Sequence, residues 1–353
     1  GQTMTASHQT EPQGWVPDVL GAPFEARTLS LGDDFEGPVV ATVVRALPKR
    51  RPFWMPPRPL EDVDVLYVHG WSDYFFQREL ARYWTDRGAR FFALDLRKYG
   101  RSLRAGQTPG YIDNLNDYDA DIAAALAAMG GSARAAAPGR RLVLFGHSTG
   151  GLVLSLWAHR HPGVASAVLL NSPWLEFQPG GFTRSAFAPV LGLQARLRPL
   201  EAMPQVDLGF YTRAQREVRG DEPPLAINEA WRPEQAFPAR MGWLHTVLDG
   251  HATVASGLHI DVPVLVMLST HTAPPTRWSD ELTRADTVLV VDIIAHRALS
   301  LGESVTVERI PGALHDVFLS RADARDIAYD RMDRWVSGCL GRPRAPLAPG
   351  SYR

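Results

Sequence analysis

The stretch LFGHSTGGLVLSLWAHRHP, residues 144–162, passes from β-forming apolar residues through spaced glycines into an apolar helical pattern. Residues 146–150 (GHSTG) fit the pattern G-x-S-x-G, with a predicted strand before them (141–145) and a predicted helix after them (149–159). Such a turn holds its serine above the sheet, and the glycines remove side chains that would clash with neighbouring backbone. The sequence therefore predicts that the hydroxyl of Ser148 projects at the positive end of a helix.

Around this turn, short apolar strands alternate with helices. Because the strands lack polar alternation, the pattern predicts an α/β protein whose mainly parallel sheet is covered by helices on both faces. A predicted hairpin, with its turn at Gly32-Asp33-Asp34, and a proline-rich loop at 48–59 precede this part. The predicted strands are 24–31, 39–46, 64–68, 90–96, 141–145, 165–170, 262–268 and 304–310, and the predicted helices are 77–87, 116–129, 149–159, 241–256, 290–301 and 322–336.

The alternation stops between residues 173 and 240, which are rich in proline and contain helical fragments but no clear strand. Structureless loops of that length are uncommon inside compact domains, so a mostly helical cap on the rim of the sheet is expected. The predicted organisation is an N-terminal extension (1–23), a core in two parts (24–172 and 241–340), the cap insertion (173–240) and a C-terminal tail (341–353).

Composition excludes several classes of partner. With 37 basic and 38 acidic residues, the chain has no global field that would attract nucleic acid or an anionic membrane. Its longest apolar runs are strand-length, and residues 1–15 resemble no signal peptide, so no integral membrane segment is expected. The single cysteine, Cys339, fits a reducing compartment, and a cytoplasmic location is predicted. The sequence does not set an oligomeric state.

A serine hydroxyl needs a base, and the base needs a group that orients it. Of 11 histidines, His315 is the best placed, since it follows the predicted strand 304–310 through a short turn. The carboxyl edge of a parallel sheet is where such sites form, so His315 is expected to reach Ser148. A surface or helix-capping role for His315 is the alternative.

The orienting acid is expected after the strand 262–268. Asp286 is the preferred candidate, because it lies directly before the apolar residues that lead into the next helix. Asp280 is the second candidate and could instead cap a helix. Asp292 and Glu176 remain open as further alternatives.

Attack of such a serine on an acyl group would also need hydrogen-bond donors for a developing oxyanion, each typically worth about 3 kcal/mol. The backbone N–H of Thr149, directly after the serine, is one candidate. The N–H of Trp71, in the loop after the strand 64–68, is the other, while His69 itself is expected to have a structural role.

Aromatic side chains of the cap could line an acyl pocket or form the cap's own core, and the sequence favours neither reading. They are Trp174, Phe177, Phe182, Phe187, Phe210, Tyr211, Trp231 and Phe237.

The order HGW (69–71), DLRKYGRS (95–102), GHSTGG, a carboxylate and GALHD (312–316) resembles the α/β-hydrolase superfamily. More narrowly, it is similar to the branch of monoacylglycerol lipase-like, lysophospholipase-like and serine aminopeptidase-like hydrolases. The resemblance spans about 64–336, apart from 173–240, and it departs where Lys98 replaces a usual glycine. It implies Ser148 as nucleophile, Asp286 as acid, His315 as base, and Trp71 and Thr149 as oxyanion donors.

Together these features predict a serine hydrolase of the carboxylic ester hydrolase class, acting through an acyl-enzyme. Its expected partner is a small-molecule ester with an apolar acyl or alkyl part, and the chemistry needs no metal or organic cofactor. An amide or peptide hydrolase, an acyltransferase and a non-catalytic ligand-binding protein of the same fold are the alternatives.

Overall fold

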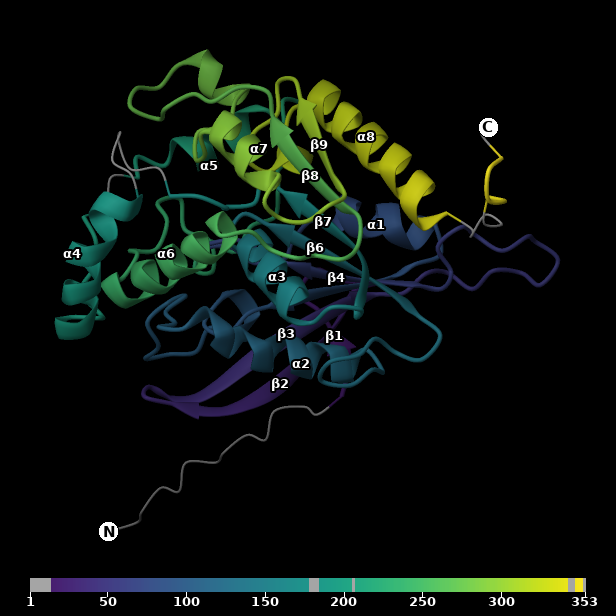
Figure 1. Cartoon of the computed structure of the whole chain (residues 1–353), viewed down its shortest axis with the longest axis horizontal. Helices are drawn as coiled ribbons and strands as arrows, with labels where there is room; N and C mark the ends of the chain where they lie inside the picture. The colour runs from purple at the N-terminus through teal and green to yellow at the C-terminus, as the bar shows by residue number, and fades with distance from the viewer. Residues whose placement is uncertain (1–13, 178–183, 205–206, 342–346, 352–353) are drawn as a thin grey trace, which may run out of the picture.

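A nine-stranded sheet forms the centre of the molecule (Figure 1). The computed structural model describes residues 14–177, 184–204, 207–341 and 347–351, without the side chains of 184–188. The strand order is β1-β2-β3-β5-β4-β6-β7-β8-β9. The strands are β1 (Val16–Pro17), β2 (Glu25–Asp34), β3 (Gly37–Ala46), β4 (Val63–Val68), β5 (Arg90–Asp95), β6 (Arg141–His147), β7 (Ala165–Asn171), β8 (Val264–Ser269) and β9 (Val305–Ile310).

The six strands from β5 to β9 in this order are parallel, and β2 and β3 add an antiparallel hairpin at one side. The predicted mainly parallel α/β sheet is therefore confirmed, and the ends of the predicted core elements shift by no more than four residues. The hairpin turn was predicted wrongly. It lies at Phe35-Glu36, because a register shift between Ser30 and Asp33 lets β2 continue past Gly32, whose φ is +82°.

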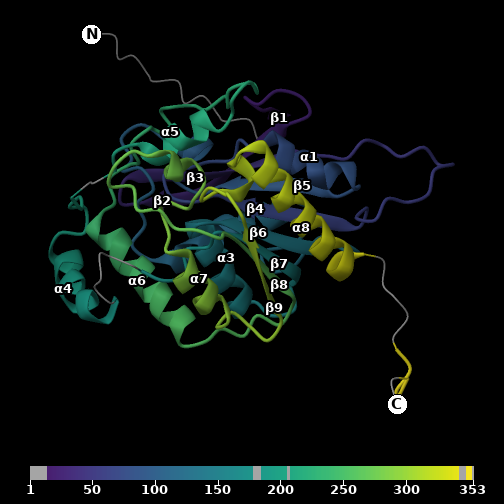
Figure 2. The same cartoon turned by 90° about the horizontal axis from the view of Figure 1, so that it is seen from above.

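Each central strand sends alternate side chains to two separate cores. Leu142 and Leu144 of β6 belong to one core, and Val143 and Phe145 belong to the other. This explains why the strands carry no polar alternation. The first core includes residues of α2 (Tyr118–Ala128), α3 (Thr149–Arg160) and α7 (Val291–Ala298), and the second includes residues of α1 (Arg78–Asp86) and α8 (Ala322–Leu340). Figure 2 shows α3 and α7 on one side of the sheet and α1 and α8 on the other.

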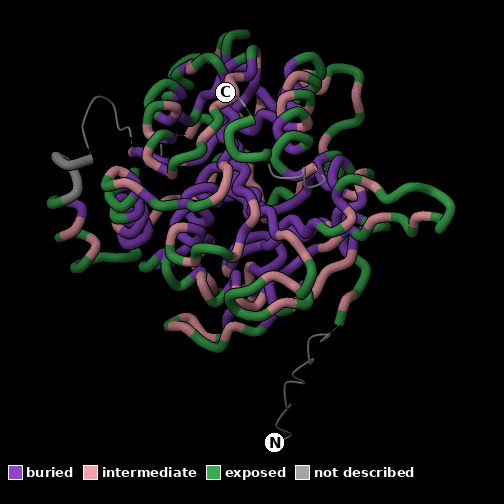
Figure 3. The backbone as a smooth tube through the Cα atoms, turned by 45° about the vertical axis from the view of Figure 1, so that its right-hand side comes forward, coloured by how far each residue is buried: buried purple, intermediate pink, exposed green. Residues whose placement is uncertain are grey.

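The chain between β7 and β8 contains α4 (Arg184–Leu197), α5 (Phe210–Glu217) and α6 (Met241–Ala255). Helices α4 and α6 lie side by side at one end of the molecule (Figures 1 and 2). Leu191 of α4 is buried, but Val190, Leu193 and Leu197 are exposed. Figure 3 shows the contrast with the central strands, where buried residues predominate. No helix in the described ranges is both long and apolar enough to cross a membrane.

Lys98, the residue that departs from the usual glycine, has a backbone φ of +64°. Its side chain is buried, and its Nζ lies 2.5 Å from Asp34 and 2.6 Å from Glu36, at the tip of the β2–β3 hairpin. Burial alone would raise the pKa values of these two carboxyl groups, but the hydrogen bonds from Lys98 hold both below their ordinary values. Two ionised partners therefore accompany a lysine in a conformation that normally favours glycine.

Candidate active site

Ser148 lies at the sharp turn between β6 and α3. Its φ of 53° and ψ of −117° are rare for a residue with a side chain. Its N–H donates to the carbonyl oxygen of Asn171 at 3.1 Å, which fixes the turn to β7. A Cβ at Gly150 would lie 2.3 Å from the carbonyl oxygens of both Val68 and His69, so only glycine fits there. The backbone of two neighbouring strands thus determines where the serine hydroxyl lies.

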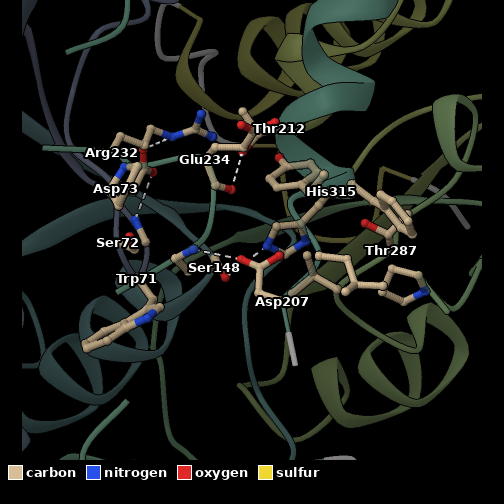
Figure 4. A pocket seen from close by; sticks show the side chains of 18 of the residues that line it. Trp71, Ser72, Asp73, Ser148, Asp207, Thr212, Arg232, Glu234, Thr287 and His315 are labelled. Atoms are coloured by element: carbon tan, nitrogen blue, oxygen red, sulfur yellow. Dashed lines mark hydrogen bonds and ion pairs between the residues drawn. The ribbon is translucent and has the colours of Figure 1, made fainter. Parts of the chain in front are cut away.

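His315 follows β9 and faces Ser148 (Figure 4). Its Nε2 accepts a hydrogen bond from Ser148 Oγ at 3.0 Å, and only 3% of the residue is exposed. Its carbonyl oxygen accepts a hydrogen bond from Ser172 Oγ at 2.5 Å. The base candidate is therefore attached at both its ring and its backbone to the turns that follow β6 and β7.

Asp286 completes the chain of contacts. His315 Nδ1 donates to Asp286 Oδ2 at 2.9 Å. The other carboxylate oxygen accepts the N–H groups of Val288 at 2.7 Å and Leu289 at 2.8 Å. The residue is fully buried, so both oxygens are held by donors rather than by water. The structure thus brings together the three side chains that the sequence singled out.

The alternative acids lie elsewhere. The side chains of Asp280 and Asp292 are 78% and 83% exposed, and each pairs with an arginine. Glu176 pairs with Arg297 at 3.0 Å. Within the described parts of the chain, Asp286 is the only one of these four carboxylates with a hydrogen bond to the candidate base.

The loop after β4 packs directly on the serine turn. A Cβ at Gly70 would lie 3.0 Å from the Cβ of Ser148. Within the ranges that the structure covers, the backbone N–H groups of Trp71 and Thr149 have no hydrogen-bond partner. Both N–H groups border the turn that carries the hydroxyl, and both are free to donate.

His69 uses both ring nitrogens within the fold. Its Nδ1 donates to the carbonyl oxygen of Gly70 at 2.7 Å, and its Nε2 accepts the N–H of Leu96 at 3.1 Å. The ring thus joins the loop after β4 to the end of β5. These contacts agree with the structural role expected for this histidine.

A cavity of about 360 Å³ opens onto Ser148 and His315. Figure 4 shows its lining side chains around these two residues. Most of the exposed lining is apolar, and much of it comes from the chain between β7 and α6. The apolar part includes Leu208, Phe210, Pro233, Pro275 and Val288.

Of the aromatic residues that the sequence assigned to the cap, some line the cavity and others pack against a core of the sheet rather than a separate core of the cap. Phe210 and Tyr211 line the cavity. Trp174 and Phe177 pack against the first core, the one that includes α3. Phe182 and the side chain of Phe187 lie outside the described residues.

Sequence reasoning weighed Tyr211 as a wall of a pocket or as part of the cap's own core, and missed its contact with the backbone beside the candidate base. The hydroxyl of Tyr211 accepts the N–H of Asp316 at 2.8 Å, and its ring meets that of His315 edge to face. The Asp316 carboxylate accepts hydrogen bonds from Asn171 and Gln77. Only the aromatic character of the cap hinted at this contact.

A buried ion pair at the cavity wall was also missed. Arg232, between α5 and α6, donates from Nε to Asp73 Oδ1 at 3.0 Å, and the side chains are 10% and 7% exposed. Burial alone would raise the pKa of Asp73, but the charge of Arg232, with smaller effects of His147 and His69, holds it below its ordinary value. Asp73 is therefore a carboxylate at neutral pH.

His147 lies beside the candidate base, and the centroids of the His147 and His315 rings are 4.9 Å apart. Its Nδ1 donates to the carbonyl oxygen of Asn171 at 2.9 Å. Burial, and then the neighbouring His315, lower its pKa against the opposing effects of Asp316 and Asp73. The ring therefore favours the neutral form.

Among the described residues there is no group of three or more His, Cys, Asp or Glu side chains that could hold a metal ion.

Residues 62–319 match the model of a family described as serine aminopeptidase, S33. Lysophospholipase L2 of Escherichia coli (strain K12) is 34% identical over 104 residues. That match covers 29% of this chain and 29% of the relative, so the likeness to the curated protein is local.

Solved structures match over most of their length. A soluble variant of monoglyceride lipase from Saccharomyces cerevisiae, in complex with a substrate analog, has a TM-score of 0.59 at 17% identity and covers 88% of this chain and 96% of its own. The monoacylglycerol lipase of Paleococcus ferrophilus has a TM-score of 0.60 at 17% identity, with 84% and 99% covered. A thermostable carboxyl esterase from Bacillus coagulans has a TM-score of 0.59 at 17% identity, with 89% and 99% covered. At these identities the likeness concerns the fold.

Proposed function

The chain belongs to the serine aminopeptidase S33 family and has the α/β-hydrolase fold, and from this premise we propose that it is a serine hydrolase cleaving carboxylic esters through an acyl-enzyme. The observation that supports the proposal most strongly is the unbroken chain from Ser148 Oγ to His315 Nε2 at 3.0 Å and from His315 Nδ1 to Asp286 at 2.9 Å. A nucleophile, a base and an orienting acid in hydrogen-bond contact are the minimum set for this chemistry.

In the proposed acylation step, Ser148 Oγ attacks the ester carbonyl carbon while His315 Nε2 accepts the hydroxyl proton. Asp286 stabilises the imidazolium that forms and keeps the ring in the required tautomer. When the tetrahedral intermediate collapses, the bond to the leaving oxygen breaks. His315 donates its proton to that oxygen, so the alcohol leaves and the acyl group stays on Ser148.

Deacylation repeats these transfers with water. His315 accepts a proton from a water molecule as the water oxygen attacks the acyl carbon. Collapse of the second intermediate breaks the bond to Ser148 Oγ, which recovers a proton from His315 as the carboxylic acid leaves. The N–H groups of Trp71 and Thr149 would stabilise the oxyanion in both intermediates, and a lost donor typically costs about 10²- to 10³-fold in kcat.

The relatives narrow the substrate class that we propose. The names of the similar proteins refer to lysophospholipids, monoglycerides and carboxyl esters. The mostly apolar lining of the cavity fits an ester with an apolar acyl or alkyl part better than a wholly polar substrate. Glycerol-based esters with one acyl chain are therefore the first substrates to test.

The proposal is tested with p-nitrophenyl acyl esters, monoacylglycerols of several chain lengths and a lysophospholipid. Wild-type protein is expected to hydrolyse at least one of them and to be labelled at Ser148 by a fluorophosphonate. Ser148→Ala should lower kcat by about 10⁶-fold and abolish the label. Ser256→Ala is the control, because this hydroxyl only donates to Thr253 on the surface of α6. Equal rates for wild type and Ser148→Ala would refute the proposal.

An amide or peptide hydrolase is the second candidate, and the description of the matching family favours it. Amino-acyl amides belong in the same substrate panel, because faster turnover of amides than of all esters would select this candidate. Product analysis with added glycerol separates hydrolysis from acyl transfer. Labelling without turnover of any ester or amide would favour a binding protein of the same fold.

A further inference from the structure

The loop Gly70–Tyr74 carries the proposed donor Trp71. Its residues make successive hydrogen bonds to the chain between α5 and α6. We call Gly70–Tyr74 the oxyanion loop and residues 228–237 the cap strap. Each of the four residues after Gly70 makes one such bond. Trp71 Nε1 donates to Phe237 O at 3.2 Å, and Phe237 N donates to Ser72 Oγ at 3.1 Å. Arg232 Nε donates to Asp73 at 3.0 Å, and Asn228 N donates to the hydroxyl of Tyr74 at 2.8 Å.

The oxyanion loop depends on such support because its backbone is strained. Ser72 directly follows Trp71 and has a φ of +50°, a region that residues with a Cβ rarely occupy. The backbone N–H of Phe237, in the cap strap, donates a hydrogen bond to the hydroxyl oxygen of Ser72. Strain of this kind persists only where surrounding contacts over-determine the conformation.

Asp73 connects the cap strap to the backbone of the oxyanion loop. One carboxylate oxygen accepts the N–H of Gly70 at 3.3 Å, and the other accepts Nε of Arg232. Arg232 is itself held by a 2.8 Å hydrogen bond from Nη1 to Gln215, a buried residue of α5. The guanidinium therefore holds a carboxylate that fixes the peptide group directly before the Trp71 N–H (Figure 4).

We propose that Arg232 is a positioning residue, which holds Asp73 and thereby keeps the Trp71 N–H where the oxyanion forms. The cap strap thus completes the oxyanion site, although the nucleophile, base and acid all lie in the core. The inference rests on the proposed function. Its consequence is that displacement of the cap strap lowers catalysis even while Ser148, His315 and Asp286 keep their contacts.

The test compares Arg232→Met with wild type. The variant is expected to lose about 10- to 100-fold in kcat, up to the value typical of one lost oxyanion donor, while KM changes by less than about 3-fold. A trifluoromethyl ketone analogue of the best ester forms a tetrahedral oxyanion on the serine, and its affinity should fall by the same factor. The corresponding secondary alcohol forms no oxyanion, so its affinity should stay within about 3-fold.

Arg325→Met is the matched control. Arg325 of α8 has the same side-chain exposure as Arg232, 10%, and pairs with Glu222 of the cap at 2.6 Å without touching the oxyanion loop. It should lose stability but keep the kcat and the ketone affinity. A thermal unfolding scan accompanies every variant. If Arg232→Met does not fold, the double variant Asp73→Asn/Arg232→Met takes its place with a loss in the same direction, because it leaves no unpaired buried carboxylate but still lacks the guanidinium that holds residue 73.

The outcomes separate the two proposals. Active wild type with unchanged kcat and ketone affinity in a folded Arg232 variant overturns the positioning role and leaves the proposed function intact. Equal losses for the ketone and the alcohol would also overturn it, since they would indicate general disorder of the cavity. Wild type that neither hydrolyses any ester or amide nor reacts with the ketone overturns both.

Discussion

The two walls of the cavity are held in place by different means. On the core side, backbone placement decides the positions of the three proposed reacting side chains, since each lies after a strand of one sheet. The turn at Ser148 closes against strand backbone that leaves no room for a side chain at residue 150. On the cap side, single side chains such as Tyr211 and Arg232 make the connections to the core. The proposed reacting groups thus tolerate little change, whereas the cap side of the cavity depends on a few separable contacts.

Asp286→Asn tests the core side most severely. It should lower kcat by about 10⁴-fold, because an amide donates where the His315 ring must donate and so disfavours the working tautomer. Steady-state kinetics on the best ester measure the effect. Asp280→Asn is the control and should retain wild-type kcat, because its side chain is 78% exposed. A large loss in Asp280→Asn, with little loss in Asp286→Asn, would move the acid to the other residue.

A pair of glycine substitutions sharpens the contrast in stability. Gly150→Ala should lower the free energy of unfolding by about 3 kcal/mol, because its Cβ would lie 2.3 Å from two carbonyl oxygens. Gly192→Ala, within α4, meets nothing closer than 3.4 Å and should raise the free energy by up to about 1 kcal/mol through helix propensity. Urea denaturation measures both values. Similar values for the two variants would contradict the view that the serine turn tolerates less change than the cap helix α4.

Tyr211→Phe tests a contact that joins the two walls. Loss of the hydroxyl removes the acceptor for Asp316 N–H beside the base, which is worth about 1 kcal/mol, and kcat should fall about 5- to 10-fold. Tyr83→Phe provides a matched control, because that hydroxyl donates to Asp333 of α8 and neither residue lines the cavity. If both variants keep the wild-type kcat, the Tyr211 hydroxyl does not help to position His315.

The division between the walls also explains what the sequence can predict. Ser148 lies in a local pattern, a strand-to-helix turn, and His315 lies in another, a turn after a strand. The structure places Ser148 Oγ 3.0 Å from His315 Nε2. The paired apolar faces of the strands made the fold class predictable.

The rest could not be predicted, because it depends on pairs that are distant in sequence. Arg232 and Asp73 are 159 positions apart, and each alone resembles an ordinary charged residue. Tyr211 is 105 positions from Asp316 and bonds to its backbone, which leaves no complementary side chain to recognise. The misplaced hairpin turn has a local cause, since the bulge near Gly32 continues a strand that composition alone would end.

The order of the proposed site along the chain has a consequence for biosynthesis. Ser148 precedes the cap, whereas Asp286 and His315 follow it, on segments attached to the last two strands of the sheet. A chain that leaves the ribosome N-terminus first therefore carries this hydroxyl long before the proposed base, His315, is synthesised, so on the proposed mechanism the growing polypeptide would have no hydrolytic activity. In a refolding experiment, the first turnover would mark the moment at which β8 pairs with β7 and β9 pairs with β8.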